Sequence, residues 1–301
     1  MHTLLPIGIP VPQVVRGRVE PFGEVWLPKA GSGQLGHLGV EVAEYFQPEL
    51  VLEPGDVVVD VGANVGAFAM YAARKVKNLR FVCVEPIPAL YDALAHNFET
   101  DPALAAVERD LWQVGLTRHG DAGEVEFTYF AHLPCDSTRH MDEKRRRFEQ
   151  FFAAKGAAVR ATLGSLGAPG RVAGRGVERI VSSLPKGALG RKLSDWATGA
   201  TRVRCPLMTL DDLVGKSDID EVALLKIDVE GAELDVLEGI SEETWKRVRQ
   251  IVLEGHDQNG RLARIREMLS ARGYDVSVRT PEIASERGVE SFLLFARRVA
   301  S

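Results

Sequence analysis

Cysteine is scarce in this chain. Its 301 residues include three cysteines, Cys83, Cys135 and Cys205, which lie far apart. An odd number without the close pairing of zinc ligands argues against both a disulfide framework and a zinc site. We therefore expect reduced thiols in a cytoplasmic protein.

Long apolar runs are also missing. None approaches the roughly 20 residues of a membrane-spanning helix, so no membrane partner is expected. The N-terminal run L-L-P-I-G-I-P-V-P is broken by prolines and lacks a preceding basic region, which makes it a poor signal peptide. There is no internal repeat. What remains, 45% hydrophobic and 26% charged residues, is ordinary for a globular protein.

Charge is distributed unevenly. The net charge of −5 by itself indicates no nucleic-acid partner, but residues 139–204 hold 15 Lys and Arg against 5 Asp and Glu, or +10, which leaves −15 elsewhere. An anionic partner or substrate group and a simply solvated surface explain this basic segment about equally well. RNA is the weakest explanation, because no module of stacking aromatics accompanies the charge. A homo-oligomer is left open.

The chain is organised around Val57–Gly66, V-V-V-D-V-G-A-N-V-G. The β-branched run predicts a strand buried on both faces, and the glycines after Asp60 predict a tight turn into a helix. Such a turn lets backbone approach a ligand at the carboxyl edge of a parallel sheet, although an ordinary turn between core elements has the same pattern.

A second strand, Phe81–Val84, ends at Glu85, about 20 residues after the glycine turn. Doubly wound folds place there the carboxylate that accepts hydrogen bonds from ribose hydroxyls, so we predict this role for Glu85. In the next strand region, Val107–Leu116, Asp110 and Trp112 are candidates for contact with an adenine or for purely structural roles.

Further strands are predicted at Glu124–Phe130, Val203–Pro206, Val222–Val229, Ile251–Leu253, Tyr274–Val278 and Ser291–Ala296. Alternating strands and helices followed by two terminal strands indicate a doubly wound α/β sheet. We divide the chain into an N-terminal cap, residues 1–50, and one domain, residues 51–301, that carries a basic insertion or lid at residues 131–201.

Three segments together are more specific than any one of them. They are D-V-G-A-N-V-G at Asp60–Gly66, V-E-P at Val84–Pro86, and L-D-D-L followed by K-I-D-V-E-G-A-E at Lys226–Glu233. This combination resembles the FkbM family of S-adenosylmethionine-dependent methyltransferases, whose members are largely O-methyltransferases. The resemblance is absent from the basic insertion, so the identity of the substrate does not carry over.

The resemblance implies a Rossmann-like sheet of seven strands with the last one antiparallel. On the matching positions it implies that the methionine part of the cofactor is held by Asp60, Gly62, Asn64 and Gly66. It places Glu85 at the ribose, and Asp228, Glu230 and Glu233 at the edge of the methyl-transfer site. A dinucleotide fits less well, because the turn lacks the G-x-G-x-x-G spacing.

A hydroxyl acceptor must lose its proton during attack, so a base is expected. His256 is the first candidate, because it follows a central strand and an unperturbed histidine titrates near neutrality. Asp228 is the second. The acids around His256 could instead bind Mg²⁺, but nothing in their spacing is diagnostic and we do not favour a metal.

Three functions follow from these residues. The favoured one is an O-methyltransferase that acts on a small molecule or natural product, with an anionic or carrier-bound acceptor under the basic insertion. A nucleotide-cofactor (NAD) oxidoreductase and a non-catalytic Rossmann-fold binding module are the alternatives.

Overall fold

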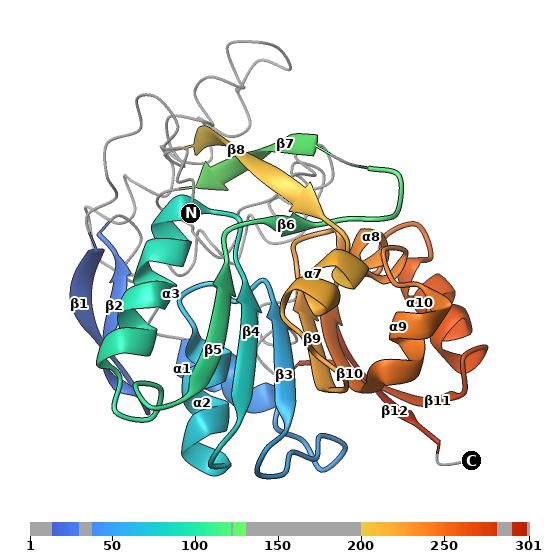
Figure 1. Ribbon diagram of the computed structural model, residues 1–301, viewed down its shortest axis with the longest axis horizontal. Helices are drawn as coiled ribbons and strands as arrows, with labels where there is room; N and C mark the ends of the chain where they lie inside the picture. The colour runs from blue at the N-terminus through green and yellow to red at the C-terminus, as the bar shows by residue number, and fades with distance from the viewer. Residues whose placement is uncertain (1–13, 30–37, 122, 131–199, 282–290, 300–301) are drawn as a thin grey trace, which may run out of the picture.

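The computed structural model describes residues 14–29, 38–121, 123–130, 200–281 and 291–299 (Figure 1). Its main sheet has seven strands in the order β11-β12-β10-β9-β3-β4-β5. Their bounds are β3 Val57–Val61, β4 Arg80–Val84, β5 Glu108–Trp112, β9 Val222–Asp228, β10 Val248–Gly255, β11 Tyr274–Arg279 and β12 Phe292–Arg298.

The five neighbouring strands β10, β9, β3, β4 and β5 are parallel to one another. β12 runs antiparallel to both of its neighbours, β10 and β11. Strand order reverses between β3 and β9, as in a doubly wound sheet. The prediction of a Rossmann-like, seven-stranded sheet with an antiparallel last strand is therefore confirmed.

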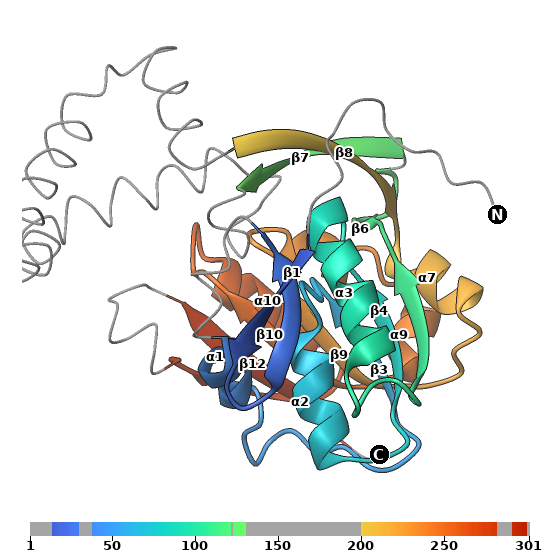
Figure 2. The same cartoon turned by 90° about the vertical axis from the view of Figure 1, so that its left-hand side faces the viewer.

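Helices cover both faces of the sheet (Figures 1 and 2). One face packs against α1 Leu38–Glu44, α2 Ala67–Lys75 and α3 Pro88–Thr100. The other packs against α7 Leu210–Lys216, α8 Glu233–Leu237, α9 Glu242–Arg247 and α10 Arg261–Ser270. Alternate residues of each strand supply these two cores, Val58 to the first and Val59 to the second, which explains the unbroken apolar runs. Within the described ranges, no helix is long and apolar enough to cross a membrane.

A smaller sheet lies across the edge where β3, β4 and β5 end (Figure 1). It contains β6 Gly115–Leu116, β7 Gly123–Phe130 and β8 Ala200–Met208 in the order β6-β8-β7. β7 and β8 are antiparallel partners outside the main sheet, as predicted for the strand Glu124–Phe130 from its alternating pattern. In the chain, the basic insertion connects the end of β7 at Phe130 to the start of β8 at Ala200. Its residues 131–199 lie outside the described part of the chain.

The N-terminal segment forms a hairpin of β1 Val14–Val19 and β2 Gly23–Pro28, beside α3 (Figure 2). The buried amide of Asn97 on α3 connects this hairpin to the glycine turn. Its Oδ1 accepts from Trp26 N at 2.7 Å, while its Nδ2 donates to Trp26 O at 3.0 Å and to Val65 O at 2.8 Å. Asn97 thus joins the hairpin and the glycine turn in one hydrogen-bond network. The division of the chain into a separate cap, residues 1–50, and one domain stays a prediction.

Two details differ from the sequence-based expectation. β9 ends at Asp228, so Glu230 lies in a turn and does not continue the strand. Gly231 adopts φ +95° in that turn, which favours glycine and interrupts regular pairing. A helix that the composition of Glu230–Gly239 predicts is the short α8, which ends at Leu237, and α9 follows it as a separate helix.

Candidate functional site

The glycine turn after β3 is held against both neighbouring strands. Gly62 N and Ala63 N donate to Val84 O at 2.9 and 3.0 Å. Gly62 adopts φ +77°, and a Cβ built on it would lie 1.9 Å from the carbonyl oxygen of Asp228. Glycine is thus required at this position because two backbone segments meet there. Asn64 and Gly66, with φ of 52° and 87°, complete the turn.

Glu85 connects this turn to the start of α3. Its Oε2 accepts from Asn64 N and its Oε1 from Ile87 N, both at 2.9 Å. Burial raises the pKa of this carboxyl to about 7, against the lowering effect of the two backbone N–H groups. Because each carboxylate oxygen can accept more than one hydrogen bond, Glu85 retains acceptor capacity for further donors.

A buried ion pair lies below the turn. Lys226, near the end of β9, places Nζ 3.0 Å from Asp60 Oδ1 and 3.5 Å from Asp228 Oδ2, and it donates to Gly62 O at 2.8 Å. Burial alone would lower the pKa of Lys226, but Asp60 and Asp228 raise it above its usual value. Asp60 is fully buried, and burial raises its pKa despite Lys226.

Tyr45, just beyond the end of α1, reaches the same edge. Its hydroxyl lies 2.6 Å from Glu254 Oε2 and 3.1 Å from Asp228 Oδ2. Glu254 and Asp228 are register partners on β10 and β9. Burial first and the Asp228 carboxylate second raise the pKa of Glu254 well above its usual range.

Two more acids and the candidate histidine lie on the β9–β10 side. His256 Nε2 is 3.9 Å from Glu230 Oε2, and both side chains are largely buried. Glu233 Oε1 accepts from Gly231 N at 3.0 Å, and its Oε2 lies 3.2 Å from Arg261 Nη1. Burial raises the pKa of Glu233 to about 7. The hydrogen bond that it accepts from Gly231 stabilises the turn between β9 and α8.

Asp110 is not brought to this group. Its Oδ2 pairs with Arg80 Nη2 at 2.9 Å, and Arg80 is the first residue of β4, at the opposite end of that strand from Glu85. Trp112 donates from Nε1 to Ser217 Oγ at 3.1 Å, beside α7. A contact between Asp110 and the cofactor therefore stays a prediction that this geometry does not support.

The small sheet closes over Glu85. Cys205 on β8 donates from Sγ to Pro86 O at 2.7 Å, and Glu85 is among the groups that raise the pKa values of Cys205 and of Tyr129 on β7 to about 12. Burial is the larger cause for both. Neither group is therefore ionised near neutral pH, which rules out a reactive thiolate at Cys205.

Metal binding finds no support in the side-chain arrangement. Among the residues that the structure describes, no group of three His, Cys, Asp or Glu side chains has an arrangement that could hold a metal ion. Magnesium binding stays a prediction that the sequence analysis did not favour.

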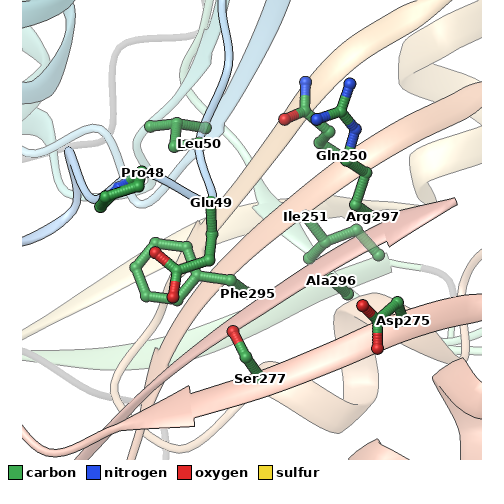
Figure 3. A pocket seen from close by; sticks show the side chains of 10 residues that line it. All are labelled: Pro48, Glu49, Leu50, Gln250, Ile251, Asp275, Ser277, Phe295, Ala296 and Arg297. Atoms are coloured by element: carbon green, nitrogen blue, oxygen red, sulfur yellow. The ribbon is translucent and has the colours of Figure 1, made fainter.

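A separate hollow of about 230 Å³ lies at the other end of the sheet (Figure 3). Gln250 near the start of β10 and Arg297 near the end of the antiparallel β12 belong to its lining, so it opens at the amino edge of the parallel strands. Glu49, another lining residue, is engaged by Arg279 at 2.6 Å. This hollow is remote from the residues at the carboxyl edge and shares none of them.

Sequence reasoning missed Tyr45 and the role of Lys226. Lys226 had a local signal, because it is a single cation within the apolar run V-A-L-L-K-I-D-V. A buried cation in such a run needs an anionic partner, and Asp60 on the adjacent strand is that partner. Tyr45 had no such signal, since an aromatic residue beside a helix is ordinarily part of a core.

Comparison with known proteins adds to this geometry. Residues 60–276 match the model of the methyltransferase FkbM domain. The methyltransferase sdnD of Sordaria araneosa is 33% identical over 228 residues, covering 73% of this chain and 74% of the relative. The 31-O-demethyl-FK506 methyltransferase FkbM of Streptomyces tacrolimicus is 28% identical, covering 85% and 86%. A crystal structure of methyltransferase FkbM from Methylobacillus flagellatus KT has a TM-score of 0.46 and 15% identity, and covers 89% of this chain and 55% of that one.

Proposed function

Because the chain belongs to the FkbM family of S-adenosylmethionine-dependent methyltransferases, we propose that it methylates a hydroxyl group of a small molecule or natural product. The name of the Streptomyces relative, which denotes an O-methyl transfer to a natural product, supports this. The observation that carries the proposal is how the two carboxyl oxygens of Asp228 are engaged. Its Oδ2 is held by Tyr45 and Lys226, while its Oδ1 makes no hydrogen bond or ion pair with a described residue.

The residues present fit the cofactor. Glu85 has acceptor capacity that suits the two hydroxyls of a ribose. Asp60 Oδ2 is buried and receives no hydrogen bond from any residue in the described ranges. Buried polar atoms without partners are rare in native proteins, so an acceptor left open beside the glycine turn is consistent with a donor supplied by a ligand. Glu85 would hold the ribose, and Asp60 and Asn64 the methionine part.

When bound, S-adenosylmethionine supplies a methyl group on a positively charged sulfur. Held by Glu85, Asp60 and Asn64, the cofactor would supply this methyl group to the acceptor oxygen, with its sulfur as a neutral leaving group. The acceptor proton must leave to a base, and we assign it to Asp228 Oδ1 or to His256. The protein otherwise orients the acceptor and excludes water from it.

The acceptor carries an anionic or carrier-linked group in this proposal. Residues 139–204 supply a net charge of +10. β7, which precedes this segment in the chain, and β8, which contains its last residues, lie over the carboxyl edge. The described edge is itself acidic, with Asp228 and Glu230. An anionic acceptor group would therefore be attracted by the basic segment and repelled by the edge, which would orient it.

Cofactor binding tests the proposal through Glu85. S-adenosylhomocysteine should raise the melting temperature of the protein, because a ligand that binds only the native state stabilises it. Since the pKa of Glu85 is about 7 and ribose hydroxyls need the ionised acceptor, affinity should fall about tenfold between pH 8 and pH 6. Calorimetry at both pH values measures this.

Glu85→Gln should bind more weakly at pH 8 and lose most of the pH dependence. Glu99→Gln, at an exposed position of α3, is the matched control and should behave as the wild type. Absence of any stabilisation by S-adenosylhomocysteine in the wild type, with stabilisation by NAD(H) instead, would contradict the proposed function. Equal affinity in Glu85→Gln would remove only the ribose assignment.

Turnover distinguishes the two candidate bases. His256→Asn should lower turnover of an identified hydroxyl acceptor by less than about tenfold if Asp228 is the base, and by about 10²–10⁴-fold if His256 is. The geometry favours the first result, because His256 is already near Glu230. Steady-state kinetics of His256→Asn and Asp228→Asn, with cofactor affinity measured in parallel, decides between them.

A further inference from the structure

The hydroxyl of Tyr45 lies between two carboxyl groups, 2.6 Å from Glu254 and 3.1 Å from Asp228. The side chain has little freedom to move away. It is 3% exposed, its ring contacts Phe68 edge-on at 5.7 Å, and Lys226 Nζ lies 5.9 Å from its centroid. The hydroxyl is thus fixed between both acids.

Proton counting limits how this arrangement is charged. A phenol hydroxyl has one proton, so it can donate to only one of the two carboxyl oxygens. Burial and the two acids raise the pKa of Tyr45 further above its usual value, so it keeps that proton near neutral pH. The carboxyl oxygen that does not receive the Tyr45 proton lies beside the phenol oxygen. No proton would lie between these two oxygens unless that second carboxyl group carried one itself. One of the two acids must therefore carry a proton.

The surrounding charges assign this proton to Glu254. Asp228 has the ammonium of Lys226 at 3.5 Å and a side chain that is 40% exposed, so it has a cation partner and contact with solvent. Among the described residues no cation lies within ion-pair distance of Glu254, and burial together with the nearby acids Asp228, Glu230 and Glu41 raises its pKa. Several charged and titratable groups surround Glu254 and Asp228, which face each other. They are Lys226 of β9, Glu230 after β9, Glu41 of α1, Asp60 of β3 and His256 after β10.

We infer that Tyr45 is a positioning residue for Asp228. Its hydroxyl donates to Asp228 Oδ2 and accepts from protonated Glu254, and this arrangement fixes the Asp228 carboxylate with Oδ1 available to a substrate proton. This inference rests on the proposed function for the role of Asp228. The proton-sharing arrangement itself requires neither cofactor nor acceptor.

Carboxyl titration tests the arrangement. Protein labelled with ¹³C at its glutamate side-chain carboxyls is titrated by NMR, and the Glu254 signal is identified as the one lost in Glu254→Gln. In the wild type it should titrate above pH 7. In Tyr45→Phe its midpoint should fall by at least about 0.5 pH units, because the phenol oxygen that accepts the hydrogen bond of protonated Glu254 is gone.

Tyr71→Phe is the matched control. Tyr71 packs against Phe46 at 4.6 Å in the same aromatic group, and no described residue makes a hydrogen bond with its hydroxyl. In the Tyr71→Phe variant, the titration midpoint of Glu254 should equal that of the wild type. A wild-type midpoint in the ordinary glutamate range, or one that Tyr45→Phe leaves unchanged, would overturn the inference.

Kinetics with an identified acceptor supplies the second measurement. Tyr45→Phe should lower kcat by about tenfold or more and change the pH dependence of kcat, with the Kd of S-adenosylhomocysteine within about twofold of the wild type. An unchanged pH profile would mean that Tyr45 acts only through packing. If the wild type bound no S-adenosylhomocysteine, the proposed function would fail, while the titration would still report on the proton-sharing arrangement.

Discussion

Lys226→Met should lower the free energy of unfolding by about 3–5 kcal/mol. Lys226 is the ion-pair partner of Asp60, and the two side chains are 4% and 0% exposed. Removing the ammonium leaves a buried carboxylate without a counter-charge and also breaks the 2.8 Å hydrogen bond to Gly62 O. Denaturant unfolding of the variant and the wild type gives the difference.

The pH dependence of this loss identifies its cause. Without Lys226, burial holds the pKa of Asp60 still further above its unfolded value. Such a group destabilises the fold above its unfolded pKa, increasingly as pH rises, and the penalty disappears below that value. The loss should therefore be larger at pH 8 than at pH 5. An equal loss at both pH values would indicate lost packing in place of an unpaired charge.

Two further variants serve as controls. Lys246→Met removes an ion pair with Glu243 of 2.7 Å, similar in length to the pair of Lys226 with Asp60. Both of these side chains are mostly exposed, at 68% and 78%. It should leave the stability of the protein essentially unchanged. The double variant Lys226→Met with Asp60→Leu should be more stable than Lys226→Met alone, because no buried charge is then left unpaired.

Gly62→Ala should destabilise the protein by more than about 3 kcal/mol and abolish cofactor binding. Two effects combine. The residue adopts φ +77°, which strains any L side chain, and its Cβ would overlap the carbonyl oxygen of Asp228 at 1.9 Å. Relief requires β3 and β9 to separate at the edge that holds Asp60, Lys226 and Asp228. Thermal unfolding, with and without S-adenosylhomocysteine, measures both consequences.

Gly55→Ala separates these two effects. Gly55 has a similar φ of +95°, but a Cβ there meets nothing within 4 Å. This variant should show the conformational penalty alone, about 1–2 kcal/mol, and keep its affinity for S-adenosylhomocysteine. If both variants lost the same stability, the close approach of Gly62 to Asp228 would be unimportant.

The sequence by itself determined the sheet and the positions of the acids at its carboxyl edge. Apolar, β-branched runs such as Val57–Val61 predict buried strands, and the glycine turn and Glu85 follow two adjacent strands at a spacing typical of nucleotide-binding folds. These features are local: each depends on the composition of about ten residues. They could be predicted because parallel strands bring their carboxyl ends to one edge.

Only the tertiary structure decided how the acids are connected. Tyr45 meets Asp228 and Glu254 across 183 and 209 residues, and nothing in the composition of either segment encodes that contact. Asp110 shows the converse, because its position in a strand suggested the site while Arg80 holds it elsewhere. Which carboxyl keeps a proton depends on burial and on neighbouring charges in three dimensions, and this is why the sequence supplied the acids and the fold assigns each its role.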